Sequence, residues 1–141
     1  MSDGAFSRDE VERAFEHTLT LQAREDWATF AETFTRDAVY EECEFGRMVG
    51  RDAILEWLLP AMEPCKGWTY PERWRSIEGN RISYGWYNRL PGRRADGSWY
   101  EFMGTSCKVY AGDGRFSYHE DVYNMKVCIA VIKEWSAAQK R

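Results

Sequence analysis

Apolar residues recur three and four positions apart in four stretches of the chain, which predicts four helices. The first is expected from about 8 to 23, because Ser7 and Glu10 form a capping box just before the pattern begins. Asp26 can cap a short second helix, and the last is expected from about 125 to 139. The first two are amphipathic, so each must pack one face against another element.

A short strand and a third helix are predicted between these segments. β-branched and aromatic residues run from 38 to 45 and stop at Gly46, as is typical of a strand. The third helix follows Gly50. Pro60 should kink or end this helix near Leu59, because proline removes a backbone donor and clashes with the preceding turn.

The second half of the chain has the pattern of strands and turns. Turn signals such as Gly79-Asn80, Pro91-Gly92 and Asp96-Gly97 predict mainly antiparallel strands near 68–78, 81–90, 98–110 and 115–123. There is no repeat, linker or low-complexity tract, so we expect one domain over residues 1–141. Helices segregated from an antiparallel sheet make an α+β domain, and a strongly bent sheet around a helix leaves a cavity between them.

The final predicted strand carries a polar pair among aromatic residues. Side chains alternate faces along a strand, so His119, Asp121 and Tyr123 share one face while Glu120 and Val122 lie on the other. The pair is either chemistry inside a cavity or two groups that hydrogen-bond each other at its rim. Buried polar groups are normally paired, so their presence alone does not decide between these readings.

Composition narrows the classes of partner and cofactor. A net charge of −4 argues against a nucleic-acid or anionic-membrane surface. No apolar run approaches the roughly 20 residues of a membrane span, and the N-terminus has no signal-peptide core, so a cytoplasmic protein is expected. The four cysteines are scattered and include no C-x-x-C pair, and the chain has only two histidines. This pattern argues against a zinc site, and we expect no metal or organic cofactor.

Aromatic residues make up 16% of the chain, including seven Trp, and many fall in the predicted sheet. Such rings either fill a core or line a pocket.

Several segments together resemble the SnoaL-like branch of the nuclear transport factor 2-like superfamily. They are "DWATFAETFTRDAVYEE" (26–42), "GRDAI" (50–54), the Asp96-Gly97 hairpin and "GDGRFSYHEDVYN" (112–124), which span nearly the whole chain. The resemblance implies a cone-shaped barrel, in which a curved, mainly antiparallel sheet wraps around helices. Its open end would admit a small, mostly apolar ligand, with acid–base residues on the inner wall.

The resemblance also implies roles for particular residues. In SnoaL-like cyclases an aspartate acts as general acid/base, and a histidine precedes it by two residues. These two positions correspond to Asp121 and His119. The isomerases of the superfamily carry their base at a position matching Glu42, and its dehydratases place a substrate-orienting tyrosine near Tyr40. Tyr40 and Glu42 share a strand face, so both point inward or neither does.

Other positions depart from these enzymes. The first helix lacks the tyrosine of an isomerase oxyanion hole, and Ser106 and Cys107 stand where a protonated carboxylic acid is expected. No Arg-x-Asp matches the epoxide hydrolases. No enzyme of the superfamily is matched at every position, so the reaction type stays open among isomerase, cyclase and dehydratase chemistry.

Two hypotheses follow for function. In the first, Asp121 is the proton shuttle of a small-molecule enzyme acting on an apolar cyclic substrate, because desolvation raises a carboxylate's pKa and His119 tunes it back toward neutrality. The expected walls of its pocket are Tyr40, Trp57, Trp86, Asn88 and Tyr123, with Glu42 as a further acid–base candidate. In the second, the chain is a non-catalytic ligand-binding or dimerisation module. A homodimer through the sheet is expected in both, because a half-open sheet rich in Trp and Tyr leaves an apolar patch in water.

Overall fold

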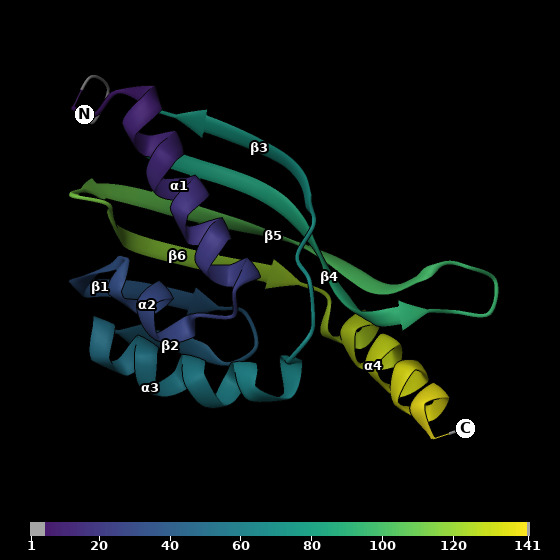
Figure 1. Ribbon diagram of the computed structural model, residues 1–141. Helices are drawn as coiled ribbons and strands as arrows, with labels where there is room; N and C mark the ends of the chain where they lie inside the picture. The colour runs from purple at the N-terminus through teal and green to yellow at the C-terminus, as the bar shows by residue number, and fades with distance from the viewer. Residues whose placement is uncertain (1–4, 141) are drawn as a thin grey trace.

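The computed structural model describes residues 5–140, so the two ends of the predicted domain, residues 1–4 and 141, lie outside the described part. The elements follow the chain in the order α1 (Arg8–Ala23), α2 (Trp27–Glu32), β1 (Phe34–Glu42), β2 (Gly46–Val49), α3 (Arg51–Met62), η1 (Glu63–Cys65), β3 (Glu72–Glu78), β4 (Arg81–Arg93), β5 (Trp99–Gly112), β6 (Arg115–Tyr123) and α4 (Met125–Gln139) (Figure 1). The α+β class is confirmed. Both predicted terminal helices have the expected bounds, and Ser7 and Asp26 cap α1 and α2 through their side chains.

One curved six-stranded sheet organises the fold, in the order β2-β1-β6-β5-β4-β3. All neighbouring strands are antiparallel except β1 and β6, which are parallel. In Figure 1 the long β4 and β5 bend along their length, α1 lies across the sheet, and α4 follows at the far end of the bend. None of the helices within residues 5–140 is both long and apolar enough to cross a membrane.

The helices pack on the concave face of the sheet through three clusters of buried side chains. α1 contacts β4, β5 and β6 through residues such as Phe15 and Phe116, and α2 and α3 contact β1 around Phe34. α4 packs Cys128 and Val131 against the outer half of β4 and β5. Because these clusters are separate, the concave face is covered at three places and a hollow is left between them.

The bounds predicted for the strand at 38–45 are wrong, and a second strand that forms a hairpin with it was not predicted. β1 begins at Phe34 and ends at Glu42, and β2 returns from Gly46 to Val49 beside it. Every residue of β2 is exposed or only partly buried. A strand with no buried face has no apolar alternation, which is why the pattern gives no sign of it.

Two elements also continue past a proline near which the sequence pattern places an end. α3 continues past Leu59 to Met62, because Pro60 lies in the last turn, where only one backbone hydrogen bond is lost before the helix ends. Pro91 does not end β4, which runs on to Arg93. The β4–β5 register shifts between Arg89 and Arg93, so Pro91 occupies an irregular stretch where a missing donor breaks no regular ladder. The first strand of this region starts at Glu72, later than predicted.

A glycine on β5 makes room for a tryptophan of the neighbouring strand. A Cβ atom added at Gly104 would lie within 3.0 Å of three ring atoms of Trp86, so the indole lies flat against the bare backbone. Gly85 has the same relation to Trp74. The side chain of Trp86 is held in place because it packs against two of the core clusters, whereas the side chain of Trp74 is exposed and can change its orientation.

We predict that Gly104→Ala destabilises the protein by about 1–3 kcal/mol, because the methyl group must push a packed indole aside. Urea unfolding followed by tryptophan fluorescence measures this. The matched control is Gly85→Ala, where the ring of Trp74 can swing into solvent and the cost should be smaller. Equal costs for the two substitutions would contradict this account.

Candidate active site

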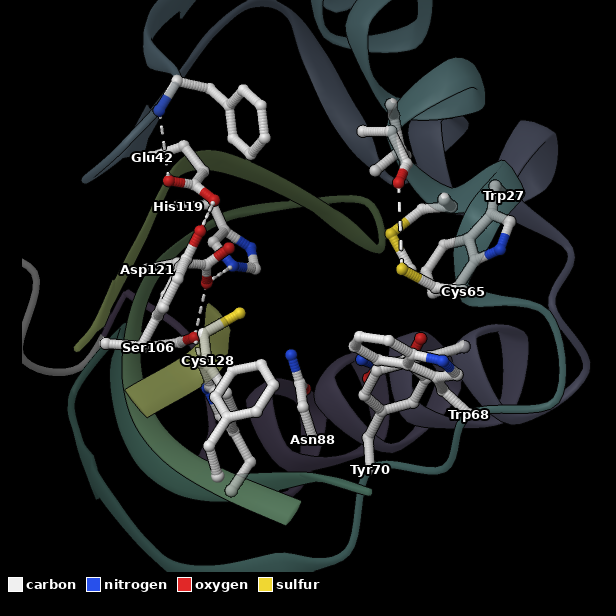
Figure 2. A pocket seen from close by; sticks show the side chains of 18 of the residues that line it. Trp27, Glu42, Cys65, Trp68, Tyr70, Asn88, Ser106, His119, Asp121 and Cys128 are labelled. Carbon is white, nitrogen blue, oxygen red and sulfur yellow. Dashed lines mark hydrogen bonds and ion pairs between the residues drawn. The ribbon is translucent and has the colours of Figure 1, made fainter. Parts of the chain in front are cut away.

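A cavity of about 380 Å³ lies between the concave face of the sheet and the helices. Its wall is mostly apolar and aromatic, with contributions from α1 to α4 and from β1, β4, β5 and β6. The structure brings all eight predicted site residues to this wall: Tyr40, Glu42, Trp57, Trp86, Asn88, His119, Asp121 and Tyr123. Figure 2 shows Asp121, His119 and Glu42 on one side of the hollow and Tyr70, Trp68 and Trp27 on the other.

Asp121 is the centre of a hydrogen-bond network on this wall. Its position in β6 sets it directly across from Ser106 in β5, whose hydroxyl donates to Oδ1 at 2.6 Å. The hydroxyl of Tyr40 in β1 donates to Oδ2, and Nε2 of His119 lies 2.7 Å from Oδ1. Three strands thus supply one hydrogen bond each to a single carboxylate.

This network reverses one expectation about Asp121. Burial acts to raise the pKa of its carboxyl, but the neighbouring His119, with the hydrogen bonds from His119, Ser106 and Tyr40, outweighs burial and holds the pKa below its ordinary value. The expectation of a carboxylate tuned toward neutral pH is therefore wrong. Asp121 is ionised at neutral pH, ready to accept a proton but weakly basic.

His119 is neutral at the same pH. Its residue is only 3% exposed, and its ring stacks on that of Tyr40 with centroids 4.3 Å apart. Burial lowers the pKa of the imidazole, although the adjacent Asp121 opposes this. Since the carboxylate accepts, the network assigns the ring proton to Nε2. Nδ1 is buried and has no hydrogen-bond partner among residues 5–140.

Glu42 supplies a second carboxylate to the wall. It is 7% exposed, and it pairs directly with Asp121 in the parallel β1–β6 register. The hydroxyl of Tyr123 donates to Oε2 at 2.8 Å, and the backbone amide of Glu44 donates to Oε1 at 2.7 Å. Tyr40 and Glu42 both point inward, as their shared strand face requires.

Ser106 is the member of the network that sequence reasoning missed. The sequence pattern marks it only as a departure from a carboxylic acid, yet it links Asp121 to Trp86, whose indole Nε1 donates to the Ser106 hydroxyl at 2.8 Å. Its importance follows from its cross-strand position opposite Asp121. Because the register between two strands cannot be read from the sequence, no sequence signal identifies this serine.

The opposite wall of the cavity is almost entirely apolar. The segment after η1 contributes Trp68 and Tyr70 to this wall. α4 contributes Cys128, Ile129 and Ile132 to the lining of the cavity. Asn88 extends its amide into the hollow between the two walls (Figure 2). In the described part of the chain, no group of three or more His, Cys, Asp or Glu side chains is arranged to hold a metal ion. The arrangement offers a mostly apolar, ring-sized space with Glu42, His119 and Asp121 at one end.

The pKa shift of His119 predicts a loss of stability in mild acid. A histidine in the unfolded chain takes up a proton near pH 6.5, and the folded site resists this, so the free energy of unfolding falls as the pH drops below that value. Between pH 7.5 and 5.5 this should cost about 1 kcal/mol. His119→Gln, whose amide can still donate to Asp121, should reduce this loss when unfolding is measured in urea at both pH values.

His17→Gln is the control for that measurement, because His17 is exposed on α1. It should lose stability between the two pH values as the wild type does. A His119→Gln variant with the same pH dependence as the wild type would contradict the assignment of a neutral, buried imidazole.

Comparisons with known proteins agree with this architecture. The family model described as a SnoaL-like domain matches residues 11–119. A LEH-like epoxide hydrolase from M. tuberculosis superposes with a TM-score of 0.72 at 20% identity, covering 93% of this chain and 95% of that chain. TerC, co-crystallised with polyporic acid, gives a TM-score of 0.71 at 14% identity, covering 88% and 98%.

An NTF2-like protein of unknown function from Burkholderia pseudomallei gives a TM-score of 0.70 at 14% identity, covering 87% of this chain and 97% of that chain. The comparison with curated proteins gives no match. These structural likenesses establish the fold, which is the predicted nuclear transport factor 2-like barrel. With the match over residues 11–119, the chain belongs to the SnoaL-like domain family.

Proposed function

We propose that this protein is a small-molecule enzyme that uses acid–base chemistry of its own side chains on an apolar cyclic substrate. One observation carries the proposal: a partly buried, ionised carboxylate, Asp121, held by donors from three strands at the polar end of an aromatic-lined cavity. Perturbed ionisable groups in a cleft are typical of catalytic sites.

The size and lining of the cavity support a compact ring-containing substrate. About 380 Å³ lies within the range of small-molecule pockets, whose walls are mainly apolar with a few polar groups that fix orientation. Trp57, Trp86, Asn88 and Tyr123 form the wall that surrounds the ring system in this proposal. TerC, which shares the fold, was co-crystallised with polyporic acid.

In this proposal, substrate binding makes Asp121 more basic. A substrate carbonyl oxygen near Tyr40 competes for the tyrosine hydroxyl, and the carboxylate then loses one of its three donors. With fewer hydrogen bonds to its charged form, the pKa of Asp121 rises. Binding and activation of the base are thereby coupled.

The proposed proton transfer starts from the carbon next to that carbonyl. The carboxylate of Asp121 takes the proton, the C–H electron pair moves into the carbonyl group, and the resulting enolate oxygen accepts a hydrogen bond from Tyr40. Burial, and then the nearby Asp121, raise the pKa of Tyr40 well above its ordinary value, so the tyrosine stays protonated and acts as a donor. Asp121 returns the proton to another carbon or to a leaving oxygen.

Hydrogen–deuterium exchange tests this reaction without a known substrate. The protein is incubated in D₂O with a panel of cyclic and polycyclic ketones, and mass spectrometry follows deuterium uptake at the carbon next to the carbonyl. We expect catalysed exchange for at least one ketone, and Asp121→Asn should lower its rate by about 100-fold or more. Glu120→Gln is the control, because it makes the same chemical change on the other face of β6.

A specific observation also favours a non-catalytic ligand-binding module. Three donors lower the pKa of Asp121, and a carboxylate so stabilised is a weak base. This alternative predicts that ketones of the panel quench tryptophan fluorescence on binding, while none of them exchanges faster than in the protein-free solution. Exchange that depends on Asp121 would exclude it.

A homodimer through the convex face of the sheet stays part of the proposal. Three large apolar side chains are exposed there, Trp74 at 43%, Met103 at 57% and Val122 at 51%. We expect analytical ultracentrifugation at micromolar concentration to give a dimer, and the double variant Met103→Glu, Val122→Glu to be monomeric because charges would be buried at the interface. A wild-type monomer under these conditions would contradict the prediction.

A further inference from the structure

A lysine is buried in the core beside the Asp121 site. Lys108, on β5, is only 1% exposed, although lysine is almost never fully buried without a partner. The Nζ atom of its amine lies 4.9 Å from the ring centroids of both Phe30 and Phe116. These rings offer a weak attraction to a cation, which is a poor substitute for water. The proposed reaction leaves this residue without a role.

The sheet register puts Lys108 next to the ionisable pair. It is the direct cross-strand neighbour of His119, and it follows Ser106 by two residues on the same face of β5. Ser106 in turn contacts Asp121. Lys108 therefore lies in the row immediately behind the network, on the same concave face.

Few other charges face Lys108. β6 presents His119 and the carboxylate of Asp121, while β1 and β4 present the hydroxyls of Tyr40 and Tyr84, which stay protonated because burial raises the pKa of both. The buried residues of α1 and α2 are uncharged. Glu120 acts on His119 from the opposite face of β6. Asp121 is thus the nearest anion on this face of the sheet.

We propose that Lys108 is a positioning residue of the Asp121 site, whose buried positive charge keeps His119 neutral and Asp121 ionised. A cation beside an imidazole opposes its protonation, and a cation near a carboxylate favours the ionised form. The imidazole then serves only as a hydrogen-bond donor to Asp121, and the carboxylate keeps its capacity to accept a proton. The catalytic consequence rests on the proposed function, whereas the electrostatic part does not.

The charge on Lys108 is itself sensitive to pH. Burial lowers the pKa of its amine to about 7, with Asp121 acting in the opposite direction. Below that pH the ammonium form is present, which covers the range in which His119 would otherwise take up a proton. Above it the ammonium is lost, and Asp121 loses a favourable neighbour.

Histidine NMR provides the test, because the chain contains only two histidines. The ring resonances of His119 and His17 are followed from pH 4 to 9 in the wild type and in Lys108→Met. We expect the titration midpoint of His119 to move up by about one pH unit in the variant, since a like charge has been removed. His17, exposed on α1, is the internal reference and should not respond to the substitution. An unchanged His119 midpoint in a folded variant would overturn the proposal.

The wild type alone decides the matter if Lys108→Met does not fold. With lysine labelled by ¹³C at Cε, the resonance of Lys108 should titrate near pH 7. The His119 ring should show a second step at the same midpoint, because it senses the loss of the neighbouring charge. A His119 ring that shows no step there would also overturn the proposal.

The activity arm separates this inference from the proposed function. If a ketone is exchanged, Lys108→Met should shift the pH–rate profile, which a purely structural lysine would not do. If no ketone is exchanged, the proposed reaction fails while the NMR result still stands. If exchange persists with an unshifted profile and His119 does not move, only the role of Lys108 is lost.

Discussion

The carboxylate of Asp121 is the constraint on which the site and much of the fold depend. A charge that is largely withdrawn from water needs hydrogen-bond donors, and the partly buried carboxylate of Asp121 receives three, from β1, β5 and β6. Each donor reaches the carboxylate because its strand has one particular register relative to β6. A shift of one residue in either pairing would turn Tyr40 or Ser106 to the other face and leave the charge without a partner.

The same network explains why the cavity can remain hollow. Burying an apolar wall stabilises the fold, but the carboxylates of Glu42 and Asp121 at one end of the cavity need hydrogen-bond donors from the protein. Tyr40 donates to Asp121 and Tyr123 donates to Glu42. Each tyrosine therefore contributes its ring to the cavity wall and its hydroxyl to a carboxylate. Stability and chemistry therefore draw on the same side chains.

Strand alternation predicted which site residues share a face, and the family resemblance implied that this face looks inward. The period of two correctly grouped His119, Asp121 and Tyr123 on one strand face. It also put Tyr40 and Glu42 on one face, and both line the cavity. Ser106 and Lys108 were not predicted as site residues, because their roles depend on their cross-strand neighbours Asp121 and His119. Local sequence patterns do not show which residues of two strands pair. The elements that were misplaced, β2 and the ends of α3 and β4, lack a buried periodic face or contain a proline that the tertiary structure accommodates.

The parallel pairing of β1 with β6 has a consequence for how the protein folds. Tyr40 and Asp121 are separated by 81 positions in the chain, yet they meet in one hydrogen bond. Contacts of such long range are costly in loop-closure entropy and form slowly, whereas helices and the β4–β5 hairpin need only local segments. The ionisable end of the cavity should thus be among the last parts to assemble on refolding, and a nascent chain still lacking its final quarter has no functional pocket at all.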